Sequence, residues 1–278
     1  MKKIVRVIIP ENAAKLIKLA LNILAKHLAD GANSVLVFLN MADMQVITTI
    51  ADTQHTLSEK LSRDAETATE DRDLVLGDPH KEIISGTVRF YVTCVRDVLL
   101  GAFKGREHHL GDWGFEVNAS PDSGVRVVIP INAAELITLA KTILAKHDAD
   151  GAGSKLSAVV NMADMQTKTT DADAKHTLAK TLERDAEKAT QARDLALGHA
   201  PEQTSYTPGT VLFYVSSVRD SLLGTFRARE RRLGDWGFNV DASVTPVTPV
   251  TDIRVTTDKS ILSMLNVFVT GNSFSTGA

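Results

Sequence analysis

The sequence predicts a mainly α-helical protein, built as a tandem duplication of a three-helix bundle unit with one very long helix per unit. Three observations support this. The stretch Leu-Gly-Asp-Trp-Gly-Phe occurs at residues 110–115 and again at 233–238, and these two copies contain both tryptophans of the chain. Apolar residues recur at helical spacing in the segments before each copy. Finally, neither Gly nor Pro occurs within residues 41–76 or 162–197, which predicts an uninterrupted long helix in each segment.

The duplication divides the chain into three parts. We predict helical repeat unit 1 at residues 1–120, helical repeat unit 2 at 121–243, and a Thr/Pro linker with a β-strand tail at 244–278. Each unit opens with a β-branched run that ends at a proline, Val5–Pro10 or Val125–Pro130, and this predicts a short strand. A helix of about 20 residues is expected after each strand, ending at the sequence Ala-Asp-Gly, whose glycine suits a left-handed cap.

The long helices pose a packing problem. At 1.5 Å per residue each spans about 54 Å, whereas the third helices, at roughly 87–104 and 210–227, are only half as long. Pairing of the two long helices is the preferred solution. The alternative is a kink near Thr48 or Thr169, which would turn each unit into a four-helix bundle. Asn40 and Asn161 are expected to cap the long helices. The expected inward-facing residues are Ile50, Leu57, Leu61, Ala65, Ala68 and Val75, and then Ala172, Leu178, Leu182, Ala186, Ala189 and Ala196.

The repeated hexapeptide is interpreted as a joint between elements. Its first glycine, Gly111 or Gly234, is expected to end the helical stretch, and its tryptophan to close the end of the bundle. The strand that follows is expected to pair with a Val-Arg-Val run, which would place a small sheet at one end of each unit.

Few residue patterns suggest chemistry. His55 follows Asp52 by three positions, and His176 follows Asp173 likewise, but a third metal ligand at supporting spacing is missing. We therefore predict structural or solvated histidines, with no catalytic residue, no cofactor-binding residue and no metal site. A net charge of −3 provides no bulk attraction to nucleic acid, so no nucleic-acid partner is expected.

Neighbouring Arg and Asp residues occur at matching places in both copies. Side chains of adjacent helical residues point in different directions, so these neighbours are not expected to form salt bridges with each other. Each arginine is expected to bond to another helix instead, and Arg72 and Arg193 should lie near the packing surface. The candidate binding or interface residues are Arg96, Arg219, Trp113, Trp236, Leu265, Val267 and Val269.

The sequence gives few indications of the cellular compartment. No run of about 18 apolar residues occurs, so we predict no membrane span. The first residues lack the uninterrupted apolar core of a signal peptide, and the single cysteine, Cys94, allows no disulfide within the chain. The localisation is unknown, cytoplasmic by default, with an exported or surface assembly as the alternative.

The C-terminal tail gives the clearest functional indication. No charged residue follows Lys259, and Leu265–Val269 is an apolar β-segment that would aggregate if left uncovered. Such a segment either folds back on its own sheet or adds to a sheet edge of a neighbouring molecule. We therefore predict a non-enzymatic structural or scaffold protein that self-assembles into a homo-oligomer or filament, with the tail docked on a neighbouring subunit. The alternative is a ligand- or partner-binding helical module that uses the cleft between the two repeat units.

Overall fold

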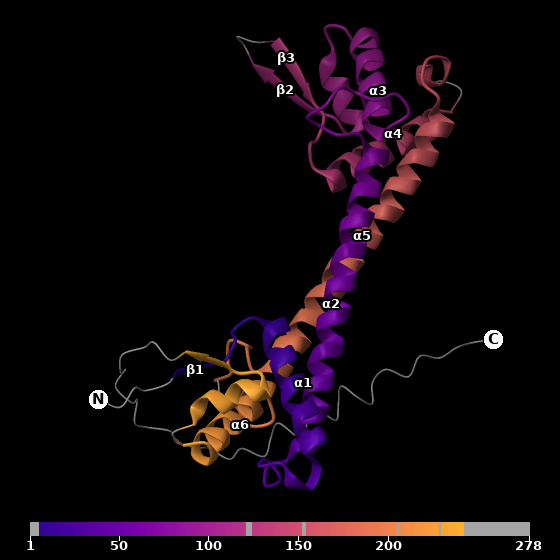
Figure 1. Ribbon diagram of the computed structural model, residues 1–278. Helices are drawn as coiled ribbons and strands as arrows, with labels where there is room; N and C mark the ends of the chain where they lie inside the picture. The colour runs from indigo at the N-terminus through magenta and orange to yellow at the C-terminus, as the bar shows by residue number, and fades with distance from the viewer. Residues whose placement is uncertain (1–5, 121–123, 152–153, 205, 228, 242–278) are drawn as a thin grey trace, which may run out of the picture. The chain divides into compact units, whose positions relative to one another are not determined.

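A computed structural model describes residues 6–120, 124–151, 154–204, 206–227 and 229–241 of the chain (Figure 1). These residues are mainly helical, as predicted. The predicted tail, with Leu265, Val267 and Val269, lies outside them. None of the described helices combines the length and apolar character needed to cross a membrane.

The main elements are β1 (Arg6–Ile8), α1 (Ala13–Asp30), α2 (Met41–Leu76), α3 (Val88–Ala102), η2 (Glu107–Trp113), β2 (Glu116–Ser120), β3 (Gly124–Val128), α4 (Ala133–Asp150), α5 (Met162–Leu197), α6 (Val211–Thr225), η5 (Glu230–Trp236) and β4 (Asn239–Asp241), with short 3-10 turns η1 (Gly31–Asn33) and η4 (Lys155–Ala158).

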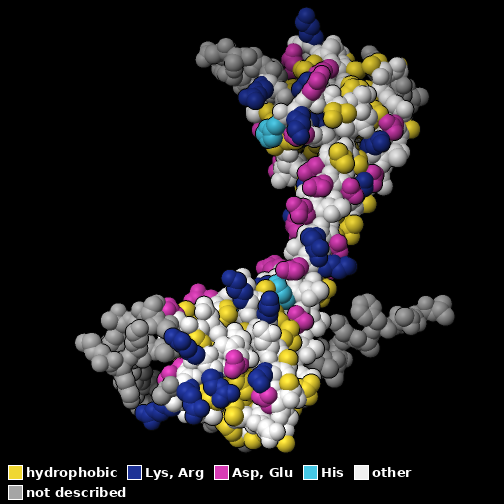
Figure 2. Space-filling model, in the orientation of Figure 1, with side chains coloured by type: hydrophobic (Ala, Val, Ile, Leu, Met, Phe, Trp, Pro, Cys, Tyr) yellow, Lys and Arg dark blue, Asp and Glu magenta, His cyan; other side chains and the backbone are white. Residues whose placement is uncertain are grey.

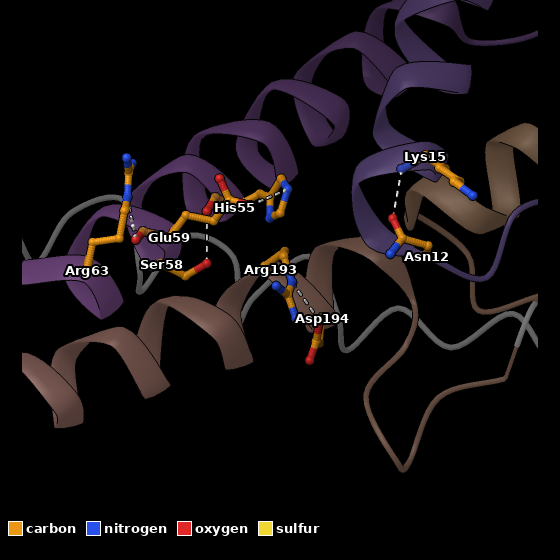
Figure 3. Close-up of polar contacts among 8 residues, drawn as sticks. All are labelled: Asn12, Lys15, His55, Ser58, Glu59, Arg63, Arg193 and Asp194. Carbon is orange, nitrogen blue, oxygen red and sulfur yellow. Dashed lines mark hydrogen bonds and ion pairs between the residues drawn. The ribbon is translucent and has the colours of Figure 1, made fainter. Parts of the chain in front are cut away.

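Local sequence signals account for where the helices begin. The Asn12 side chain accepts a hydrogen bond from the backbone N–H of Lys15 at 3.2 Å (Figure 3). Asn40 and Asn161 cap the long helices as predicted, accepting from the N–H groups of residues three positions later at 3.2 and 3.1 Å. These bonds satisfy N–H groups that have no partner inside the helix.

Both long helices are uninterrupted over 36 residues. The alternative with a kink near Thr48 or Thr169 is therefore wrong, because both threonines lie inside continuous helix and are buried. The helical stretch after α3 also ends later than predicted. Gly111 and Gly234 lie within 3-10 turns, and the left-handed caps are Gly114 and Gly237, with φ of 85° and 90°.

The described residues form two compact units that divide the chain differently from the sequence repeats. Unit 1 comprises residues 6–53 and 192–241, and unit 2 comprises residues 54–191. We call residues 1–120 the first half of the chain and residues 121–243 the second half. Each unit has its own apolar core, and each core takes residues from both halves.

Unit 1 brings the beginning and the end of the described chain together. β1 pairs antiparallel with β4, with Val7 opposite Val240. α1 packs against α6, and Trp236 lies in the core beside them. The two strands that close this unit are thus about 230 residues apart in the sequence.

Unit 2 has the same kinds of element in a different chain order. β2 pairs antiparallel with β3, with Val117 opposite Val127, and α3 packs against α4. The expected pairing of each post-motif strand with a Val-Arg-Val run is confirmed. The prediction that each sheet forms within one repeat unit is wrong, because each sheet takes one strand from each half. For β2 and β3 the reason is their short separation of three residues, which is enough for a hairpin between antiparallel strands.

The long helices lie side by side within unit 2, as predicted. Residues of α2 and α5 line a shared shallow groove of about 690 Å³, with Ala65 and Ala186 among its lining residues. The alanines of the expected inward face are buried, but Leu57 and Leu178 are 41% and 52% exposed, so that part of the prediction is wrong. Ser58 is buried instead, because a small side chain lets two helices approach closely where a leucine would hold them apart.

A tyrosine–aspartate pair joins the two halves in each unit. In unit 2 the Tyr91 hydroxyl donates to the Asp164 carboxylate, and this bond raises the pKa of Tyr91 to about 12. In unit 1 burial is the main cause of the raised pKa of Tyr214, and Asp43 adds to it. A neutral tyrosine hydroxyl is favoured in both places, for Tyr91 mainly by its hydrogen bond to a carboxylate and for Tyr214 mainly because burial disfavours the charged form.

Replacing Tyr91 with phenylalanine is expected to lower the free energy of unfolding of unit 2 by about 1–2 kcal/mol near neutral pH, since Asp164 loses its donor. The folded-state pKa of Tyr91 lies above its ordinary value of 10.0, so this stabilisation is fully present below about pH 10 and is lost as the pH rises through about 12. Urea unfolding of the wild type and Tyr91→Phe at pH 8 and pH 12 would measure it. A difference that stays constant between these pH values would contradict the expectation.

Candidate functional site

An open groove of about 1170 Å³ in unit 2 is the candidate functional site. Six consecutive residues, 126–131, form one wall and continue β3 into the turn that follows it. The other wall is the first half of α4, where Ala134, Glu135, Thr138 and Thr142 recur at helical spacing. The remaining lining residues are Arg96, Gly114, Glu116, Asn132 and Leu139. The groove therefore runs between a strand and a helix, and takes residues from both halves of the chain.

Local sequence explains both walls. The ladder with β2 ends at Val128, and Pro130, which has no backbone N–H, follows two residues later. The Asn132 side chain then caps α4 by accepting from the N–H groups of Ala134 and Glu135. Among the described residues β3 pairs with β2 alone, so its other edge presents backbone groups that the sheet does not use.

A buried arginine holds the corner between β3 and α4. The Arg89 guanidinium donates to the backbone carbonyl of Pro130 at 3.0 Å and to that of Gly77 at 3.3 Å. Arg89 is 8% exposed, and burial lowers its pKa. This residue was not predicted from the sequence. The available signal was an arginine directly beside the apolar stripe of the third helix, where the second half has Leu212.

The charges around the groove are nearly balanced. Arg96 pairs with Asp97 at 2.7 Å, and Glu116 accepts from the Asn118 amide at 3.1 Å. Arg126 and Glu135 are exposed on opposite walls. The site therefore suits a segment of low net charge better than a highly charged ligand.

The predicted absence of salt bridges between neighbouring Arg and Asp residues is wrong. Arg96–Asp97, Arg72–Asp73 and Arg193–Asp194 ion pairs are each 2.7 Å long, and Arg219–Asp220 is 2.8 Å (Figure 3 shows Arg193 with Asp194). The Cα–Cβ directions do diverge, but the flexible arginine stem is long enough to turn the guanidinium back to the next carboxylate. The prediction that Arg72 and Arg193 lie near the packing surface is confirmed, because their side chains are 14% and 19% exposed.

The candidate binding residues of the sequence do not form one site. Arg96 lines the groove of unit 2, whereas Arg219 belongs to α6 in unit 1. Trp113 and Trp236 are buried, 5% and 3% exposed, one in each core, as expected of residues that close a bundle end. A lysine ammonium lies over each indole ring, 5.8 Å and 5.7 Å from the centroid.

The histidines make local contacts. His55 pairs with Glu59 at 3.5 Å (Figure 3), and Asp173, the predicted neighbour of His176, forms an ion pair with Lys141 at 2.8 Å. Over the described ranges, no group of three or more His, Cys, Asp or Glu side chains is placed to hold a metal ion. His27 hydrogen-bonds the Ser34 hydroxyl at 2.6 Å, which ties the end of α1 to the following turn.

Basic residues gather near the end of α6. Arg227, Arg229, Arg231 and Arg232 are exposed, and Figure 2 shows Lys and Arg side chains across this face of unit 1. Arg232 lies over the Phe226 ring at 4.9 Å and near Asp235 at 4.0 Å. Acidic side chains lie among them in the same view, so no large surface of one charge sign forms here.

Comparison of the chain with protein-family models, with curated proteins and with solved structures returns no match.

Proposed function

We propose that this protein is a non-enzymatic structural protein that self-assembles, with the C-terminal tail of one molecule bound as an added strand in the groove of another. The observation that carries the proposal is that β3, which pairs with β2 alone among the described residues, contributes residues 126–128 to an open groove that α4 also lines. An extended segment placed there gains backbone hydrogen bonds from the strand and side-chain contacts from the helix.

The size and charge of the groove support the tail as its occupant. Residues 126–128 of β3 line the groove, which corresponds to about 10 Å of extended chain, and residues 129–131 continue the same wall beyond the strand. The tail residues 262–270 have strand composition and carry no charge, which matches the nearly balanced charges of the groove. The tail follows β4, which belongs to unit 1, whereas the groove belongs to unit 2. Docking between molecules in this head-to-tail manner produces a ring or a filament, depending on whether the rotation closes.

A mass measurement in solution tests the proposal. The intact chain, of 30.1 kDa, is expected to form species of several subunits at micromolar concentration, and a chain ending at Ser243 is expected to be monomeric. Ala134→Trp, which fills the groove from the α4 side, should also reduce the assembly to monomers. Ala14→Trp, at the corresponding exposed position of α1, is the matched control and should assemble normally. Assembly that survives both truncation and Ala134→Trp would contradict the proposal.

A second candidate function is the binding of an extended segment from a different protein. The observation that favours it is the mixed lining of the groove, where Arg96 from the first half faces residues 126–142 of the second half. An intact chain that stays monomeric would favour this function over self-assembly. Screening a peptide library against the monomer should then select ligands that Arg96→Ala weakens by about tenfold. Arg219→Ala, outside the groove, should leave their affinity unchanged.

A further inference from the structure

The contacts that build each unit are contacts between the two halves of the chain. In unit 1, β1 and α1 of the first half pack against β4 and α6 of the second. In unit 2, β2 and α3 of the first half pack against β3 and α4 of the second. Each half thus offers two different surfaces, one for each unit.

The two sets of contacts match position by position. Val7 lies opposite Val240 in one sheet, and Val127, which corresponds to Val7, lies opposite Val117 in the other. The tyrosine–aspartate pairs match in the same way. Gly237 packs against Asn22 of α1, and its counterpart Gly114 packs against Thr142, at the corresponding position of α4.

These matches make the surfaces of one half complementary to each other. The first half presents Val7, Asp43 and Asn22 on one surface, and Val117, Tyr91 and Gly114 on the other. Two copies of the first half can therefore form both units through isologous contacts, in which both copies use the same two surfaces.

We propose that each half carries a self-complementary dimer surface, whose partner is either the other half or a second copy of the same half. In the intact chain the covalent connection sets the effective concentration of the other half near the millimolar range, so the two halves of one molecule pair. Cutting that connection removes this advantage and allows like halves to pair. The inference does not depend on the tail, which none of these contacts uses.

The strand register allows a covalent test in the full-length protein. A protease recognition sequence replaces residues 121–123, between β2 and β3, and Cys94→Ser removes the native thiol. In this background Val7→Cys and Val117→Cys face each other only when two first halves pair, because in the intact chain each lies opposite a residue of the second half. Paired positions in an antiparallel ladder are close enough for a disulfide.

After cleavage, incubation and mild oxidation, we expect a disulfide-linked dimer of the first half in a denaturing gel. The uncut chain should show no such crosslink within one molecule. The matched control carries Val7→Cys with Val240→Cys, and should form a disulfide between the two halves whether or not the chain is cut. Formation of the control crosslink without the first-half dimer would overturn the inference. Native mass spectrometry of the cut protein without added cysteines provides a second readout, because separation into single unpaired fragments would also overturn it.

Discussion

Replacing Trp113 with alanine is expected to lower the free energy of unfolding of unit 2 by about 3–5 kcal/mol. The indole is 5% exposed and belongs to the unit 2 core with Leu110 and Phe115, so its removal leaves a large cavity. The Lys146 ammonium over the ring also loses a cation–π contact. Urea unfolding followed by circular dichroism would measure the loss.

Each core contains one tryptophan, so fluorescence can follow the two units separately. Trp236 lies in the core of unit 1, so in the Trp113→Ala variant the remaining tryptophan fluorescence reports on unit 1 alone. Asp112→Ala, next to Trp113 but exposed, should change the stability by no more than about 0.5 kcal/mol. A cost below about 1 kcal/mol for Trp113→Ala would show that the indole does not close the bundle end.

Helix positions were predictable because their determinants are local. An asparagine in the cap position marks where α2 and α5 begin, and the first glycine after each marks where they end. Absence of Gly and Pro between these points predicted 36 helical residues in each case. The periodic apolar residues of α1, α3, α4 and α6 were similarly sufficient, because burial of one face requires that spacing.

Which helices and strands pack against each other was not predictable from the same patterns. Both halves carry nearly the same strands and apolar faces, so the sequence pattern alone does not indicate whether α1 packs against α3 or α6. Chain connectivity decides which helices pack together. In the sequence, the only indication of it was that three residues separate β2 from β3. The compact units consequently cross the repeat boundaries.

The groove was even less predictable. Arg96 was identified as a candidate, but nothing in the sequence placed it beside α4, which lies in the other half. Arg89 was missed because a buried arginine that bonds to carbonyl groups looks, in sequence, like a surface residue. Its partners, Gly77 and Pro130, are 12 and 41 positions away.

Gly114→Ala is expected to lower the free energy of unfolding of unit 2 by about 2–5 kcal/mol, for two separable reasons. The residue has φ of 85°, which costs an L-amino acid about 1–2 kcal/mol. In addition, an added Cβ would lie 2.8 Å from the Thr142 Cγ2 methyl, and overpacking of this kind costs about 1–3 kcal/mol. The measurement is again urea unfolding. Gly111→Ala, where an added Cβ meets no atom within 4 Å, is the matched control and should not destabilise the unit.

A double-mutant cycle separates the two costs. Thr142→Ser removes the methyl group that the new Cβ would meet, and keeps the hydroxyl that donates to the Thr138 carbonyl at 3.0 Å. Gly114→Ala should therefore cost less in the Thr142→Ser background, and the difference measures the steric part. The backbone part should remain in both backgrounds. If Gly114→Ala costs the same in both, the close approach of η2 to α4 is not what requires glycine at this position. Because Gly114 and Thr142 both line the groove, the same cycle also reports how tightly the base of the groove is packed.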